Sequence, residues 1–103
     1  MKIEFGIHTI EIDSPTGARL SGRMFSGVLH LGTRFVVACR IEHKSPDQVP
    51  IREPVGALSL TVKQITCYGK NVEALDEGLT GCIKVEGDGL HIISPEMSMV
   101  GEE

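Results

Sequence analysis

Along much of this chain, apolar and polar residues alternate with the period of two that is typical of a half-buried β-strand. The alternation begins at Ile3, Phe5 and Ile7 and stops at the turn Asp13–Gly17, which contains Pro15. No segment repeats its apolar residues with the 3.6-residue period of a helix. The pattern therefore predicts an all-β protein.

Glycine-containing turns divide the rest of the chain into further short strands. Apolar and β-branched residues favour strands at 3–12, 19–25, 28–31, 33–42, 57–68, 72–74, 78–85 and 90–93. The stretch His43–Gly56 is expected to be a long loop, because it holds Pro46, Pro50 and Pro54 and proline cannot donate to a β-ladder. The polar, acidic tail 94–103 is expected to be loosely held.

The expected architecture is a small closed β-barrel of about six to eight mainly antiparallel strands. An open sheet of this size would leave long edges that can pair with other chains, and closure removes those edges. The chain has 103 residues, which suffice for one hydrophobic core, and it contains no internal repeat or linker. Residues 1–103 are therefore expected to form a single domain.

Two segments resemble a known family. The segment Gly17–Gly32 resembles the opening of the second domain of translational GTPases, the β-barrel domain 2 of elongation factor Tu, with its Gly-Arg-x-x-x-Gly-x-x-x-x-Gly rhythm. The segment Val62–Ala74 is similar to that family's strand and hairpin, which end in Val-x-x-Ala, and glycines follow at 78, 81 and 87 as they do in the family. The likeness covers about residues 17–93 and implies a translation-factor barrel standing alone.

In that family the chemistry resides in a separate GTPase domain with a Gly-x-x-x-x-Gly-Lys-[Ser/Thr] phosphate loop. Here Gly-Lys occurs at Gly69-Lys70, where Asn71 follows and no glycine stands five residues earlier, so no phosphate cradle is expected. The family's barrel helps to hold the aminoacyl end of tRNA and contacts ribosomal RNA in relatives. Thr66 stands where the family has an acidic or amide side chain, so aminoacyl-end binding is not carried over.

The resemblance thus implies a non-catalytic binding module that engages RNA or a component of the translation apparatus, without nucleotide or cofactor. Five glycines are expected to be structural, at sharp turns or close strand crossings, where positive φ or the absence of Cβ is needed. They are Gly22, Gly27, Gly32, Gly78 and Gly81.

Charge is unevenly distributed on this chain of net charge -4. Residues 17–52 hold six Lys and Arg against two acids, while the remainder holds four against twelve. Side chains alternate between the two faces of a strand, so residues an even number of positions apart lie on the same face. Arg19 and Arg23 are therefore expected to share an outer face with Phe25, and Arg34 is expected to share one with Arg40. These five residues form a candidate basic stripe with an exposed aromatic, suited to RNA or an acidic protein.

Two alternatives stand beside the basic stripe. An ordinary mixed-charge surface would explain the same arginines. A small acidic protein-protein regulator or inhibitor could use the barrel as a scaffold, and the acidic residues outside 17–52 would then contact its partner. The overall acidity argues against broad nonspecific affinity for nucleic acid.

Other chemistry is not expected. The three cysteines, Cys39, Cys67 and Cys82, and the four histidines lack metal-ligating spacing, and no nucleophile or carboxylate pair forms a catalytic constellation. An odd number of cysteines in apolar surroundings is typical of reduced thiols in a cytosol. Neither a signal peptide nor a membrane-spanning stretch is recognisable, so a soluble, cytoplasmic protein is expected. The sequence leaves the oligomeric state and the partner's identity open.

Overall fold

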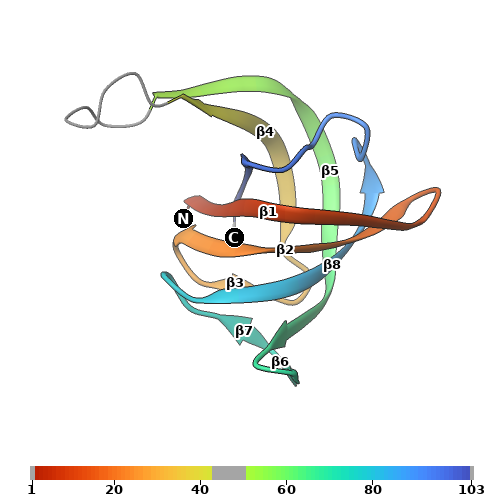
Figure 1. The fold of residues 1–103 in the computed structure, drawn as a ribbon, viewed down its shortest axis with the longest axis vertical. Coiled ribbons are helices and arrows are strands. Elements are labelled where there is room, and N and C mark those ends of the chain that lie inside the picture. Colours follow the sequence, from red (N-terminus) through yellow and green to blue (C-terminus); the bar gives the residue numbers. More distant parts are fainter. Residues whose placement is uncertain (1, 43–50, 103) are drawn as a thin grey trace.

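The computed structural model describes residues 2–42 and 51–102, and in this part of the chain every regular element is a β-strand (Figure 1). The strands are β1 (Lys2–Ser14), β2 (Gly17–Ser26), β3 (Leu29–His30), β4 (Arg34–Glu42), β5 (Ile51–Cys67), β6 (Lys70–Val72), β7 (Ala74–Leu75), β8 (Thr80–Asp88) and β9 (Met97–Glu102). The described residues contain no helix of the length and apolarity needed to cross a bilayer.

Six of these strands close into a ring. Their order is β4-β9-β1-β2-β8-β5, and β5 pairs back with β4. All of these pairings are antiparallel. Strand β6 extends the sheet beside β5, and β3 pairs with β7 at one end of the barrel. The predicted all-β barrel is therefore confirmed.

The core fills the inside of this ring. Inward-facing side chains alternate along β1 and β2, as the sequence pattern requires, and the rings of Phe5 and Phe35 meet with centroids 6.5 Å apart. Other fully buried large side chains come from strands all round the barrel: Ile3, Leu20, Met24, Leu29, Leu60, Ile65, Leu75, Ile83 and Met99. Burial of these apolar side chains is the main stabilising contribution to the fold.

Glycines allow the strands to turn and to approach one another. A Cβ atom at Gly22 would overlap the backbone oxygen of Gly6, and one at Gly81 would lie 2.9 Å from the oxygen of Thr66. Gly27, Gly32 and Gly78 adopt positive φ angles of 77°, 87° and 86° in turns. These positions therefore require either the missing side chain or the left-handed backbone that glycine tolerates.

The end of the chain differs from expectation. The tail predicted to be loose over 94–103 contributes β9 (Met97–Glu102), which pairs with both β1 and β4 and is buried from Met97 to Gly101. A strand with neighbours on both edges needs no alternation of apolar and polar residues when both of its faces are covered. The strand predicted at 90–93 is instead a turn, closed by a 3.0 Å hydrogen bond from Ile92 N to Gly89 O.

The predicted loop His43–Gly56 is also shorter than expected. Residues 51–56 belong to β5, and the rest of that segment, 43–50, lies outside the described residues. Pro54 is accommodated opposite Cys39, next to a register shift between β4 and β5. Proline in a strand is tolerated at such an irregularity, because the ladder is already interrupted there. Proline content alone therefore overestimated the loop.

Candidate functional site

The four arginines of the predicted stripe do not lie together. Arg19 and Arg23 are exposed on β2, and Arg34 and Arg40 are exposed on β4. Two strands separate β2 from β4 in either direction round the ring, so the pairs occupy opposite sides of the barrel. Alternation along a strand shows which face of the sheet each side chain lies on. It does not show where that strand lies in the ring, because this depends on which strands pair.

Three of the arginines have acidic neighbours. The Nε of Arg19 lies 3.7 Å from the Asp13 carboxylate, which also receives the Lys84 ammonium at 3.1 Å. Arg34 stands opposite Glu102 in the β4–β9 register, and Arg40 stands opposite Glu53 in the β4–β5 register. Opposite charges on directly opposed residues of one face attract weakly. The surface at these three positions is thus of mixed charge.

Phe25 is presented by a β-bulge. Glu4 pairs with Ser26 and Phe5 pairs with Met24, so Phe25 has no partner in the register, and its side chain lies on the outer face that it shares with Arg23 along β2. The ring covers Gly6, where a Cβ would overlap it, and the side chain remains 42% exposed. A flat aromatic face is thereby held in place on the outer surface.

Arg23 is held beside this ring. Its Nε donates to the carbonyl oxygen of Gly78 at 3.1 Å. Gly78 is in turn anchored by its own amide, which donates to the oxygen of Met24 at 2.7 Å. One of the two edges of the guanidinium is thus used for positioning, and the terminal nitrogens remain available to a partner.

Phe25 and Arg23 line a hollow of about 340 Å³ on the outer surface of β1, β2 and β8. We call this hollow the Phe25 groove. Figure 1 shows the paired ends of β4 and β5 extending from the ring as a curved two-stranded arm, which carries Ile41. Besides Phe25 and Arg23, the lining residues are Gly6, Ile7, His8, Ser21, Gly22, Ile41, Thr80, Glu96 and Met97. The groove combines an apolar floor with one fixed cation, Arg23, and one acidic residue, Glu96.

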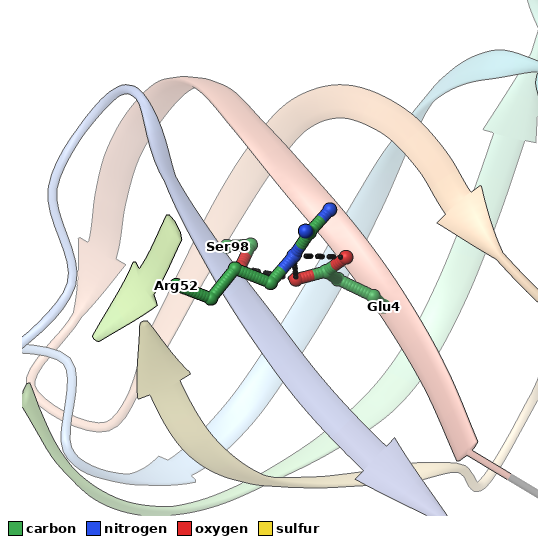
Figure 2. Close-up of polar contacts among 3 residues, drawn as sticks. All are labelled: Glu4, Arg52 and Ser98. Carbon is green, nitrogen blue, oxygen red and sulfur yellow. Dashed lines mark hydrogen bonds and ion pairs between the residues drawn. The ribbon is translucent and has the colours of Figure 1, made fainter. Parts of the chain in front are cut away.

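A buried carboxylate lies on the far side of Phe25. Glu4 is only 6% exposed, and its two carboxylate oxygens accept hydrogen bonds from Arg52 Nε at 2.9 and 2.7 Å (Figure 2). The hydroxyl of Ser98 donates to the same carboxylate at 2.8 Å. Glu4 thus joins β1 to β9 and to the β5 side of the arm, which restrains the arm against the barrel.

The same carboxylate changes the acidity of two neighbours. Its hydrogen bonds raise the pKa of the Arg52 guanidinium, which keeps that group charged. Burial raises the pKa of the Cys39 thiol, and the negative charge of Glu4 raises it further, against the opposing charges of Lys2 and Arg52. A thiol with a raised pKa forms little thiolate near neutral pH.

We therefore expect the cysteines to react at different rates. At pH 8 a disulfide reagent should modify Cys82, which is exposed, more than about tenfold faster than Cys39, which is buried and has a raised pKa. Spectrophotometric thiol counting measures both phases, and the variant Cys82→Ser should lose the fast phase. A single fast phase from all thiols would contradict the burial of Cys39.

Among residues 2–42 and 51–102, no three His, Cys, Asp or Glu side chains are grouped closely enough to hold a metal ion. A second hollow, of about 360 Å³, lies between Arg19 and Lys84 and includes Thr66 and Cys82. Its two cations share Asp13 as a partner, so their charge is partly compensated. The Phe25 groove is therefore the stronger candidate for binding an anionic or aromatic ligand.

Sequence reasoning identified Phe25 and Arg23 and missed the residues around them. Ile41 and Glu96 come from distant parts of the chain, so only the fold brings them to the groove. Glu4 stands between Ile3 and Phe5, where alternation places it outside, and nothing in the local sequence shows that Arg52 and Ser98 cover it. Gly6 could have been recognised, since a glycine within a strand often marks a place where another group lies close to the backbone.

Comparison with known proteins identifies the fold. No protein-family model and no curated protein sequence matches this chain. Two crystal structures of the translation elongation factor SelB from Methanococcus maripaludis are similar to it, the apo form and the complex with the GTP analogue GPPNHP. For each, the TM-score is 0.70 at 13% sequence identity, over 99% of this chain and 19% of the SelB chain.

The chain thus has the fold of one β-barrel portion of a translation elongation factor and spans about a fifth of SelB's length, 19%. This agrees with the resemblance to a translation-factor barrel at the level of fold. At 13% identity the likeness extends to the fold alone, and it carries neither ligand nor activity.

Proposed function

We propose that this barrel is a non-catalytic binding module that engages single-stranded RNA, or an RNA component of the translation apparatus, through the Phe25 groove. The observation that carries the proposal is the pairing of an outward aromatic ring, held over Gly6, with an arginine anchored through Nε. Stacking of a base on an aromatic face and attraction of a phosphate to a guanidinium are the two contacts on which single-strand binding relies.

The similarity to SelB supports a role in translation, because its barrel belongs to an elongation factor. A cytoplasmic location follows from that role. The non-catalytic part of the proposal rests on the sequence, in which no phosphate loop and no catalytic constellation were recognised. The acidic balance of the chain, -4, favours a localised contact over broad attraction to nucleic acid.

A titration of fluorescein-labelled hexa-adenylate at low salt, followed by anisotropy, tests this proposal. Phe25→Leu should weaken binding about tenfold, because leucine still covers Gly6 but offers no aromatic face. Arg23→Gln should weaken binding by a similar factor and lower the dependence of log affinity on log salt by about 0.7. Both variants should unfold at nearly the wild-type denaturant concentration.

The matched control is Arg34→Gln, which removes the same charge from the opposite side of the ring. It should leave the affinity for hexa-adenylate unchanged apart from a small effect of net charge. Equal weakening by Arg34→Gln and Arg23→Gln would contradict a localised site. If the wild-type protein binds no RNA at low salt, the RNA-binding proposal is wrong and an acidic protein regulator becomes the better explanation.

A further inference from the structure

A smaller hollow of about 320 Å³ adjoins the Phe25 groove and shares Phe25 as a wall. Its other lining residues are Lys2, Glu4, Ser26 and Arg52. We call it the Lys2–Arg52 hollow. Phe25 therefore has a hollow on either side, one mainly apolar and one lined mainly by charged and polar side chains.

Arg52 is positioned for this hollow by a buried partner. Both hydrogen bonds to Glu4 run through Nε, and the carboxylate is held in place by the Ser98 hydroxyl. Figure 2 shows the two terminal nitrogens turned away from the carboxylate, and they make no hydrogen bond to another described residue. The Arg52 side chain is 40% exposed. Its planar terminal edge is thus fixed in direction and reachable from solvent.

The charges of the hollow favour an anion. Lys2 and Arg52 contribute two positive charges and the Glu4 carboxylate compensates one of them, so the lining carries one net positive charge. Glu102 stands opposite Lys2 in the β1–β9 register but forms no ion pair with it within the described residues. A guanidinium edge and an ammonium in one hollow, with Ser26 also in its lining, offer donors that match the oxygen atoms of a phosphate.

We propose that the Lys2–Arg52 hollow binds a phosphate group, namely the backbone phosphate adjoining a base that stacks on Phe25. This inference rests on the proposed function. It adds the path of the RNA strand, which would run from the Phe25 groove across the aromatic ring of Phe25 into the Lys2–Arg52 hollow. A phosphate is favoured over a peptide carboxylate because the aromatic wall common to both hollows suits a base next to its own phosphate.

Two variants and one control test the phosphate site. Lys2→Gln removes an exposed cation and leaves the Glu4–Arg52 pair intact. The double variant Glu4→Gln with Arg52→Gln removes the guanidinium without leaving a carboxylate buried and unpaired, which a single change at Arg52 would do. Lys63→Gln is the control, because Lys63 is an exposed lysine that lines neither hollow. Thermal unfolding establishes that each variant is folded.

Inorganic phosphate is titrated first, with nitrogen-15 NMR of the folded protein as the readout. The Arg52 Nε–H and the Ser26 amide should shift in the wild-type protein. In the double variant, which lacks the Arg52 signal, the Ser26 amide should no longer shift. Hexa-adenylate affinity should fall about tenfold in the double variant and in Lys2→Gln, which corresponds to loss of one charge-assisted contact. Lys63→Gln should match the wild type in both measurements.

The failures are distinguishable. If hexa-adenylate binding depends on Phe25 but not on Lys2 or Arg52, and phosphate shifts neither signal, the phosphate site is overturned while the proposed function stands. If phosphate shifts both signals but no RNA binds, the proposed function fails and the anion site stands. A hexa-glutamate peptide that shifts the same signals at lower concentration than phosphate would overturn the assignment to phosphate.

Discussion

Replacing Gly22 with alanine is expected to lower the free energy of unfolding by about 3 kcal/mol. A Cβ at this position would overlap the backbone oxygen of Gly6 on the neighbouring strand and lie 2.9 Å from two ring carbons of Phe5. Neither neighbour can withdraw cheaply, since one is backbone and the other is a fully buried ring. Urea unfolding followed by circular dichroism measures the change.

Gly32→Ala is the control for that experiment. Gly32 has a positive φ of 87° but no atom within 4 Å of an added Cβ, so alanine there meets backbone strain without a steric clash. Gly32→Ala should lower the free energy of unfolding by about 1 kcal/mol. Equal costs at the two positions would show that β1 and β2 do not approach each other as closely as the structure has them.

Replacing Arg52 with methionine is expected to destabilise the fold by about 2 kcal/mol at pH 7. The change leaves the buried Glu4 carboxylate with the Ser98 hydroxyl as its remaining partner among the described residues. The expected cost is below the range for a fully buried pair, because the Arg52 side chain is 40% exposed and solvent can partly replace it. Methionine keeps much of the apolar stem's packing.

One comparison separates loss of charge pairing from loss of packing. Adding Glu4→Gln to Arg52→Met should recover more than half of the lost stability, because the neutral amide needs no counter-ion. A deficit that Glu4→Gln leaves unchanged would mean that the ion pair does not anchor the arm. Urea unfolding of the single and double variants measures the difference.

The strands of the barrel could be predicted where burial is one-sided. In β2 one face meets the core and the other is more exposed, so a period of two is written into Leu20 to Met24. In β1 the apolar residues Ile3, Phe5 and Ile7 show the same period, although Glu4 and Gly6 between them are covered as well. Strand β9 is covered on both faces, and its mixture of Met, Ser, Val and Gly lacks that period. Pro54 was predicted to lie in a loop because a rule based on the local sequence does not see the bulge at Val55, where β5 pairs with β4.

The candidate site was predictable only in part. Exposure of Phe25 and Arg23 follows from parity on β2, and both line the groove. The expectation of a single basic stripe was wrong because Arg34 and Arg40 lie two intervening strands away in either direction. That separation depends on which strands pair, and pairing between distant segments leaves no local trace in the sequence. The anchoring of Arg52 by Glu4 is hidden for the same reason.

RNA is proposed to bind on the Phe25 side of the barrel. Nitrogen-15 NMR of the wild-type protein, titrated with unlabelled hexa-adenylate at low salt, tests it most directly. We expect shift changes to cluster at the amides of Gly6, Arg23, Phe25 and Thr80, which line one groove. Shift changes centred on Arg34 and Arg40 across the ring, or none at any concentration, would contradict it.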